Sequence, residues 1–388
     1  MPTVSIIIPT YNQDRFIAQT VESALAQTYP QTEVIVVDDG SADNTSAVLA
    51  EYGGRIRHIY QENKGQSAAR NTGIAASRGQ YLLFLDGDDL IPPHKLELHV
   101  ALLDAHPEFG LVYSGFQYLS EDGTEILGEE RPRKQGAVLE DLLRRTFTFP
   151  PGAAVIRREC LDRVGLFDEA LKGPVDTDMY VRIAAAGYHF GYIEQPLLLY
   201  RVVRSSVSGD IEGMRRNEFG RLDKLFARPD LPDHIRALMG EAYAVMHYEF
   251  GAKCYHVGDI ESAQEHLRQA IALCPALSEN REWLLEWIAG YAHGPRVETP
   301  MQFIDALFAH LPPEAVTLKG LKRRAKGRYH VAAAFRDHWG RRYKGARAHI
   351  VPAITGDPSI LRNRGFLRIA ADSVIKPIAA SVYSIRRG

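Results

Sequence analysis

Residues 63–89 read NKGQSAARNTGIAASRGQYLLFLDGDD and contain a turn, a helix and a strand in succession. The spacing of apolar residues predicts a helix over residues 67–77. The apolar run at residues 81–85 predicts a buried strand, which ends in the acidic sequence DGDD. A helix followed by a buried strand is the repeating unit of an α/β sheet, so this stretch decides the fold class.

The same alternation extends outward over the first 115 residues. Apolar, β-branched runs that predict strands occur at residues 4–8, 33–37, 56–60, 81–85 and 110–113. Helix-like segments lie between them at residues 15–27, 44–52, 67–77 and 93–105. Runs such as VIVV, apolar at every position, are typical of strands covered on both faces. We therefore expect a mostly parallel central sheet flanked by helices.

Beyond this sheet the pattern becomes helical. We expect three parts, with an α/β domain over residues 1–213, a helical region over 214–313 and a basic, mostly helical segment over 314–388. The helical region contains one set of residues with the spacing of a 34-residue tetratricopeptide hairpin, namely Gly251, Gly258, Ala263, Leu267, Ala270 and Pro275. A single copy is weak evidence, because such repeats need neighbours to bury their faces.

Composition restricts the class of protein. Hydrophobic residues make up 45% and charged residues 24%, which is typical of soluble globular proteins. Three cysteines without a CxxC spacing favour a reducing cytoplasm over a disulfide framework or a structural zinc site. The N-terminus has no basic region of the signal-peptide kind, and no apolar run reaches the length of a membrane span.

Charge is distributed unevenly along the chain. Residues 314–388 contain 17 Lys/Arg and 4 Asp/Glu, a net charge of +13, which leaves −15 on residues 1–313. This basic segment can lie on an anionic membrane surface or pack as a helical cap on the acidic body. It has no recognisable nucleic-acid reading motif, so we expect no nucleic-acid partner.

Two strand ends carry candidate nucleotide contacts. The first strand runs into Pro9, Thr10, Tyr11 and Asn12, and the second ends in two adjacent aspartates, of which Asp39 is the candidate for nucleoside recognition. Ligands of open α/β sheets bind beyond the carboxyl ends of the strands. The plainer alternatives are an ordinary strand-to-helix turn and two capping carboxylates.

The stretch quoted first adds a phosphate and metal site. Lys64 and Arg70 are placed to contact nucleotide or pyrophosphate. Asp86, Gly87 and Asp88 follow the buried strand, and crowded carboxylates repel one another unless a cation binds. Oxygen-only ligands suit Mg²⁺ or Mn²⁺, so we expect Asp86 and Asp88 to bind one of these ions.

A fourth motif, GPVDTDMYVRIAAAG at residues 173–187, supplies the candidate base. Asp176 precedes the helix expected at residues 178–186, and a carboxylate there can take the proton of an acceptor hydroxyl. Asp178 is then a cap or a substrate contact, although both can simply cap the helix. Farther on, Arg204 can offset charge on a departing diphosphate, or belong to a solvated loop.

Taken in order, these motifs resemble glycosyltransferase family 2 over about residues 2–210. The resemblance implies the GT-A fold and an inverting sugar transfer from a nucleotide diphosphate sugar, most often a uridine one, with Mn²⁺ or Mg²⁺. It implies that Asp39 meets the base, that Asp88 is the principal metal ligand with Asp86 nearby, and that Asp176 is the catalytic base. It also implies that Thr10 and Arg70 line the nucleotide pocket.

The chain departs from the family pattern at two positions. Val175 stands where members commonly have glutamate, and Val203 stands where many have a histidine. Arg204 is then the candidate replacement for that histidine.

The leading interpretation is an enzyme of surface polysaccharide or glycolipid synthesis. Its acceptor is a hydroxyl of a glycan or lipid-linked molecule, and its location is cytoplasmic or peripheral on the inner face of the cell membrane. One rival is a catalytically idle sugar-nucleotide-binding or scaffold protein. Another is a nucleotidyltransferase, against which the lack of a glycine-rich, lysine-bearing phosphate loop counts.

Overall fold

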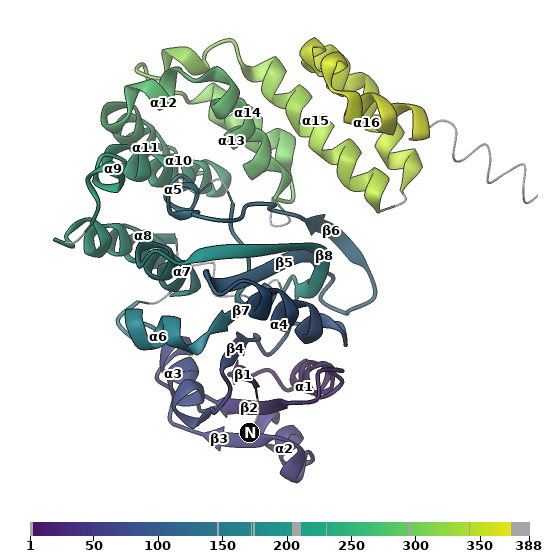
Figure 1. The fold of residues 1–388 in the computed structure, drawn as a ribbon. Coiled ribbons are helices and arrows are strands. Elements are labelled where there is room, and N and C mark those ends of the chain that lie inside the picture. Colours follow the sequence, from purple (N-terminus) through teal and green to yellow (C-terminus); the bar gives the residue numbers. More distant parts are fainter. Residues whose placement is uncertain are drawn as a thin grey trace, which may run out of the picture. The chain divides into compact units, whose positions relative to one another are not determined.

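The computed structural model describes residues 3–373, except positions 146, 172, 174, 204–210, 230, 295–296 and 341. The chain forms two compact units, Met1–Leu238 and Met239–Gly388 (Figure 1). The first contains the whole sheet, and the second is helical throughout its described part.

Eight strands of the described residues form one mixed sheet in the first unit. In chain order they are β1 (Val4–Thr10), β2 (Thr32–Asp38), β3 (Arg57–Tyr60), β4 (Tyr81–Phe84), β5 (Phe109–Leu119), β6 (Ile126–Glu130), β7 (Ala154–Arg157) and β8 (His189–Arg201). Their order across the sheet is β3-β2-β1-β4-β7-β5-β6, with β8 paired to β5. Strands β3, β2, β1 and β4 are parallel, and β7 runs antiparallel to both of its neighbours.

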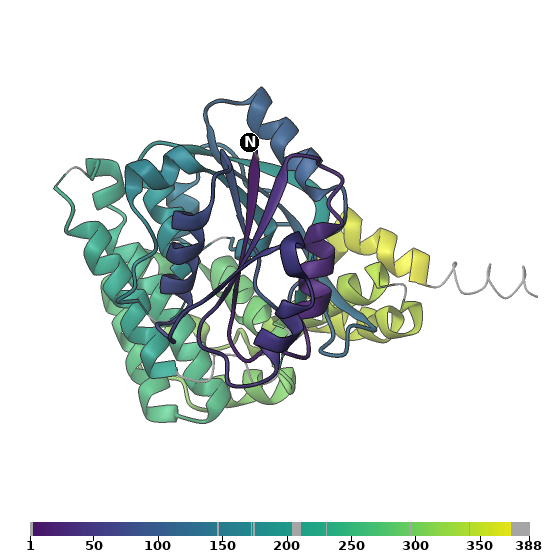
Figure 2. The ribbon, with the colours of Figure 1, turned by 90° about the horizontal axis from the view of Figure 1, so that it is seen from below.

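Helices cover the sheet. They are α1 (Ile17–Leu25), α2 (Thr45–Ala50), α3 (Gln66–Ala76), α4 (Lys95–Ala105), α5 (Leu139–Leu143), α6 (Arg158–Val164), α7 (Val175–Ala185), α8 (Ile211–Phe226) and α9 (Asp233–Arg236), with short 3₁₀ turns η1 (Gly53–Arg55) and η2 (Pro151–Ala153). Figure 2 shows α1 and α3 on opposite sides of the first strands. Every residue of β1 is therefore buried, as expected for a strand covered on both faces. Gly73 lets α3 approach β1, because a Cβ there would lie 2.3 Å from Ile7 Cγ2.

The predicted fold class is confirmed, and several bounds differ from those expected. Strand β5 continues to Leu119, well past residue 113, because β6 and β8 pair with its second half. Helix α7 begins at Val175 instead of residue 178. The buried side chains of Val175, Met179 and Ile183 lie four residues apart, so the apolar stripe of this helix starts at Val175. Asp176 therefore lies within the first turn of α7.

The first unit also extends beyond the domain boundary expected at residue 213. Helix α8 is tied to it by ion pairs between Glu218 and Arg145, at 2.8 Å, and between Lys224 and Asp168. The compact unit consequently ends at Leu238. The three-part division of the chain at residues 213 and 313 stays a prediction.

The second unit consists of helices α10 (Met239–Val257), α11 (Ile260–Leu273), α12 (Pro275–Glu279), α13 (Arg281–His293), α14 (Pro300–Ala309), α15 (Lys322–Trp339) and α16 (Tyr343–Gly356), with 3₁₀ turns η4 (Val316–Leu318) and η5 (Pro358–Arg362). Helices α10 and α11 pack closely at Gly251, where a Cβ would lie 2.7 Å from Leu267 Cδ1. Gly258 makes the turn between them at φ +82°. Membership of this hairpin in the tetratricopeptide class stays a prediction.

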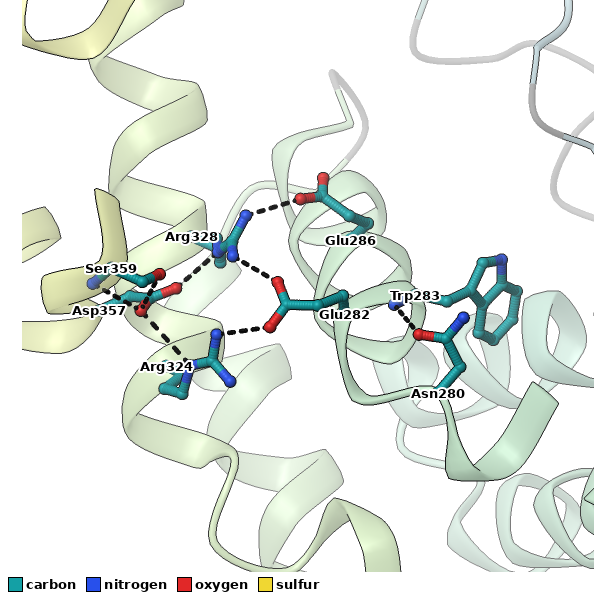
Figure 3. A network of polar contacts seen from close by, with 8 residues as sticks. All are labelled: Asn280, Glu282, Trp283, Glu286, Arg324, Arg328, Asp357 and Ser359. Carbon is teal, nitrogen blue, oxygen red and sulfur yellow. Dashed lines mark hydrogen bonds and ion pairs between the residues drawn. The ribbon is translucent and has the colours of Figure 1, made fainter. Parts of the chain in front are cut away.

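The described part of the basic segment is built into the second unit. Leu318, Leu321 and Ala325 belong to the same buried cluster as residues of α10–α14. Figure 3 shows Arg324 and Arg328 of α15 bridging Glu282 of α13 and Asp357, at 2.6–3.4 Å. No helix within the described ranges has both the length and the apolar character needed to cross a bilayer.

Candidate functional site

The candidate residues lie at one edge of the sheet, where the parallel strands β1, β2 and β4 end. The backbone N–H of Asp39 donates to the carbonyl of Thr10 at 2.9 Å, so the ends of β1 and β2 are held level. The backbone N–H of Leu85 donates to the carbonyl of Ile7, and Asp86 follows directly. This is the edge at which open α/β sheets bind ligands.

Asp39 organises the loop that precedes α3. Its buried carboxylate accepts hydrogen bonds from Gln61 Nε2 at 2.7 Å and from the backbone N–H groups of Lys64 and Gly65 at 3.0 and 2.8 Å. A carboxylate has about four lone-pair sites, so about one remains for a ligand. The Lys64 side chain is exposed, and its backbone is what fixes Asp39.

Asp38 has the capping role that was the alternative for this pair. Its carboxylate accepts from the backbone N–H of Ser41 at 2.9 Å and from the Ser46 hydroxyl. The two adjacent aspartates therefore differ in function, because Asp38 holds its own turn and Asp39 holds the loop across the strand edge.

The end of β1 is mostly buried, and a residue that follows it is accessible to a ligand. Pro9 and Thr10 are buried, whereas Tyr11 is 49% exposed and can contact a ligand. Asn12 adopts φ +51°, and its Oδ1 accepts from the backbone N–H of Ala42 at 2.8 Å. Asn12 thus joins the loops that follow β1 and β2, and this contact uses its side-chain oxygen.

Arg70 and Asp86 form the central ion pair of the site. Arg70 is 1% exposed, and its Nη2 lies 2.8 Å from Asp86 Oδ1, which also accepts from Gln66 Nε2 at 3.0 Å. The Arg70 guanidinium also lies 5.2 Å from the centre of the Phe167 ring. Among the described residues, Arg70 Nε and Nη1 have no hydrogen-bond partner. Buried donors are normally satisfied, so these two nitrogens suit an anionic ligand.

Gly87 allows the DGDD loop to pack under the end of β1. A Cβ at this position would lie 2.1 Å from Gln13 Oε1 and 3.1 Å from Thr10 Oγ1. The Gly87 carbonyl accepts from the buried Thr20 hydroxyl at 2.9 Å. A larger residue would therefore push the flanking aspartates away from β1.

Arg201, at the end of β8, holds the other side of this loop. Its Nε donates to the Asp88 carbonyl at 2.8 Å, and its backbone N–H donates to Asp89 Oδ1 at 2.9 Å. Burial raises the pKa of the Asp88 carboxyl to about 6, with neighbouring Asp86 acting in the same direction and Arg201 opposing the shift. Burial likewise raises the pKa of Asp89. The carboxylates are thus costly to keep ionised without a cation.

The carboxylate oxygens of the DGDD loop suit a divalent cation, but they would fill only part of its coordination shell. Asp86 and Asp88 offer carboxylate oxygens, and the part of the chain that the structure describes has no group of three or more His, Cys, Asp or Glu side chains arranged around one metal position. Mg²⁺ typically binds through one or two carboxylates plus substrate phosphates and water. The remaining ligands would therefore come from a bound diphosphate.

Asp176 belongs to the same electrostatic environment as the ion pair. Burial raises the pKa of its carboxyl; Asp86 acts in the same direction, and Arg70 opposes it. Tyr180, one turn along α7, is buried near the same charges, and within the described ranges its hydroxyl has no hydrogen-bond partner. Asp178, in contrast, accepts from Arg182 Nε at 2.8 Å and serves the packing of α7.

The structure thus links most of the predicted residues through contacts that the sequence did not reveal. Gln66 connects the loop held by Asp39 to Asp86, and Arg70 connects Asp86 to the surroundings of Asp176. Arg201 anchors the DGDD loop, and its place at the end of the apolar run LLLY, three residues before Arg204, was the sequence signal for it. Arg204 lies outside the described residues.

Residues 5–165 match the family model described as Glycosyl transferase family 2. An uncharacterized glycosyltransferase of Rickettsia typhi is 34% identical over 186 residues, which cover 47% of this chain and 58% of that protein. The uncharacterized glycosyltransferase EpsJ of Bacillus subtilis is 30% identical over 215 residues, covering 52% of this chain and 61% of that protein. The chain thus spans about three fifths of the length of these two relatives.

Solved structures share the fold at low sequence identity. S. aureus TarS residues 1–349 superpose with a TM-score of 0.53 and 18% identity, covering 86% of this chain and 90% of that one. The complex of the same protein with UDP-GlcNAc gives a TM-score of 0.52 at 17% identity. The mannosyltransferase PcManGT from Pyrobaculum calidifontis, in complex with GDP-Man and Mn²⁺, gives 0.50 at 22% identity and covers 79% of this chain and 86% of that one.

Proposed function

We propose that this chain, of which residues 5–165 match glycosyltransferase family 2, transfers a sugar, with inversion, from a nucleotide diphosphate sugar to a hydroxyl of a glycan or lipid-linked acceptor. The expected donor is a UDP-sugar, a choice supported by the TarS complex with UDP-GlcNAc. GDP-mannose is the alternative donor, because PcManGT was solved in complex with it. The proposed setting is surface polysaccharide synthesis at the cytoplasmic face of the membrane.

The proposal rests on one observation. Asp176 lies close enough to the Arg70–Asp86 ion pair for both of these charges to act on its carboxyl. A transferase of this kind needs a base on one side of the sugar carbon and positive charge near the leaving diphosphate on the other. Asp176 is the proposed base. Arg70 is the proposed diphosphate contact, because two buried nitrogens of its guanidinium have no hydrogen-bond partner among the described residues.

The remaining residues bind and orient the donor. Asp39 and the loop it holds receive the nucleoside, with Tyr11 exposed beside them. Asp88 and Asp86 would hold Mn²⁺ or Mg²⁺, which neutralises charge on the diphosphate when bound. Gly87 keeps both carboxylates against the end of β1. Arg204 stays a proposed second cation for the diphosphate.

Asp176 then acts as the general base of the transfer. Its carboxylate accepts the proton of the acceptor hydroxyl while that oxygen forms a bond to the anomeric carbon. The bond from this carbon to the diphosphate oxygen breaks on the opposite face, so the configuration inverts. A carboxyl with a raised pKa is a stronger base than an ordinary aspartate, which favours this transfer.

Nucleotide binding is expected to depend on the metal, because the two proposed ligands, Asp86 and Asp88, fill only part of its coordination shell. Titration calorimetry with UDP should show affinity that falls at least tenfold when EDTA replaces Mn²⁺ and that returns when excess Mn²⁺ is added. Asp88→Asn should bind UDP equally weakly with and without the metal. Metal-independent binding by the unaltered protein would remove Asp86 and Asp88 from the proposed site.

The function itself is tested by a panel of nucleotide sugars that includes UDP-GlcNAc and GDP-mannose. Slow hydrolysis of the true donor should release free nucleoside diphosphate, which a coupled assay detects, and Asp176→Asn should release much less. Tight binding of a nucleotide sugar without turnover of any would favour the idle-binding alternative.

A membrane contact through the basic segment is also proposed. Leu361 and Leu367 are 47% and 44% exposed, and Arg362, Arg364 and Arg368 are exposed beside them. Asp357 is the only acidic residue between positions 338 and 371, and it is buried. Such a surface suits an anionic bilayer, to which each basic residue contributes about 1 kcal/mol.

Reversing the charge of two exposed arginines tests this contact and leaves the buried residues of the basic segment in place. The double variant Arg364→Glu, Arg368→Glu should weaken binding to phosphatidylglycerol vesicles in low salt by about 30-fold or more, because at least two favourable contacts are lost. The matched control, Arg268→Glu with Arg281→Glu, changes the same charge elsewhere in the second unit and should bind normally. Equal sedimentation of both variants with vesicles would refute the contact.

A further inference from the structure

A cavity of about 250 Å³ lies within the first unit, apart from the strand edge. The segment after α6, helix α7 and helix α8 form its walls, and Figure 1 shows α7 and α8 next to each other. Its lining residues are Leu166, Asp168, Asp178, Val181, Arg182, Arg221, Lys224, Leu225 and Arg228. None of these residues has a role in the proposed donor site, so the cavity needs its own explanation.

The lining is strongly basic. It contains four Lys/Arg side chains against two aspartates, a net charge of +2. Both aspartates already have partners, since Asp178 pairs with Arg182 at 2.8 Å and Asp168 pairs with Lys224. Lys224 has three N–H donors, so one bond to Asp168 leaves others available. The cavity therefore presents excess positive charge to its interior.

Arg221 supplies a buried donor that the protein leaves unused. Its side chain is 3% exposed, and its Nε and Nη2 both donate to Glu218 Oε2, at 3.2 and 3.0 Å. Nη1 lies on the other edge of the planar guanidinium, where no hydrogen-bond partner occurs among the described residues. Burying such a donor without a partner is costly, and Arg221 is one of the residues that line the cavity.

We propose that this cavity binds a phosphate group carried on a small organic ligand. Arg221 and Lys224 would hold the phosphate oxygens, because a guanidinium edge and an ammonium group both suit that geometry. The volume of about 250 Å³ far exceeds the roughly 30 Å³ share of one water, so there is room for more than a bare ion. Val181 and Leu225 offer apolar wall to the carrier.

The position of the cavity connects it to the proposed reaction. Glu218, the partner of Arg221, acts electrostatically on Asp176, so the wall of the cavity lies near the proposed base. If the proposed function holds, the ligand is the phosphate-bearing part of the acceptor. Phosphate binding itself rests only on the cavity and does not require sugar transfer.

Calorimetric titration of the full-length protein without divalent metal tests the site. The probes are inorganic phosphate and methyl phosphate, with sodium chloride at equal ionic strength as the blank. Lys224→Gln and Arg221→Lys should each weaken binding of methyl phosphate about tenfold or more, since each removes a charge-assisted hydrogen bond. Arg215→Gln, which alters another ion-paired arginine of α8 outside the cavity, should stay within about twofold of the unaltered protein.

The outcomes separate the alternatives. Methyl phosphate that binds at least as tightly as inorganic phosphate supports a carried phosphate, whereas binding of inorganic phosphate alone overturns the organic carrier. Equal affinity in Lys224→Gln and Arg215→Gln, or no binding by the unaltered protein, overturns the site. Lys224 is largely exposed, so that variant tests the site even where Arg221→Lys does not fold. Hydrolysis of the nucleotide-sugar panel is measured in parallel, so a failed phosphate site and a failed donor site give different results.

Discussion

Asp176→Asn is expected to reduce sugar transfer by about 10² to 10⁴-fold while leaving affinity for the nucleotide sugar nearly unchanged. The amide keeps the size of the side chain but cannot accept the proton of the acceptor hydroxyl. Because burial raises the pKa of Asp176, transfer by the unaltered enzyme should be lost as the pH falls through a value above that of an ordinary aspartate. Steady-state turnover and calorimetry, measured across pH, check both statements.

Asp178→Asn is the matched control for this variant. It makes the same chemical change in the same turn of α7, but it weakens the ion pair with Arg182. We expect it to lower the free energy of unfolding by about 1–3 kcal/mol and to leave the turnover of folded enzyme within a few-fold. Near-normal turnover of Asp176→Asn would place the base at another residue.

Arg70→Met is expected to have the second largest effect. It removes the only cation that is hydrogen-bonded to Asp86 among the described residues, and it leaves the carboxylates of Asp86 and Asp176 without their shared positive neighbour. Affinity for UDP with Mn²⁺ should fall tenfold or more. Because Arg70 lowers the pKa of Asp176, any residual transfer should be lost at a higher pH than in the unaltered enzyme.

The effect of Arg70→Met on UDP affinity must be distinguished from its effect on folding, because breaking a buried ion pair costs about 3–5 kcal/mol of unfolding free energy. Arg158→Met is the control. Arg158 donates to the Gly79 carbonyl and the Ser77 hydroxyl, just after α3, and these contacts involve no candidate site residue. Urea unfolding should show a loss for both variants, and calorimetry should show weakened UDP binding for Arg70→Met only. Equal UDP affinity in the two variants would exclude Arg70 from the nucleotide site.

The first half of the sheet was predictable because its signals are local. Strands β1, β2 and β4 are buried over most of their length, and their runs of apolar residues are visible without knowledge of their partners. The second half was less so. Strand β5 continues through Gln117, and pairs there with β6 and β8 from later in the chain, so its length depends on long-range pairing.

The candidate site, like the sheet, could be predicted only in part. The sequence placed Asp39, Asp86 and Asp88 after strands, and the order of the parallel strands brought those ends together. It offered capping for both Asp38 and Asp39, but it did not reveal that Asp38 alone caps its turn while Asp39 holds the loop before α3, or that Asp178 pairs with Arg182. These roles depend on which side chains the folded backbone places within hydrogen-bond distance, and no spacing rule encodes that.

Asp39, Asp88 and Asp176 are proposed to serve one donor site. A crystal structure of the protein with a UDP-sugar and Mn²⁺, measured at a wavelength where manganese scatters anomalously, tests this proposal most directly. We expect an anomalous peak at the Asp88 carboxylate, the uracil beside Asp39 and the anomeric carbon facing Asp176. Nucleotide bound elsewhere, or Asp176 turned into a separate pocket, would contradict it.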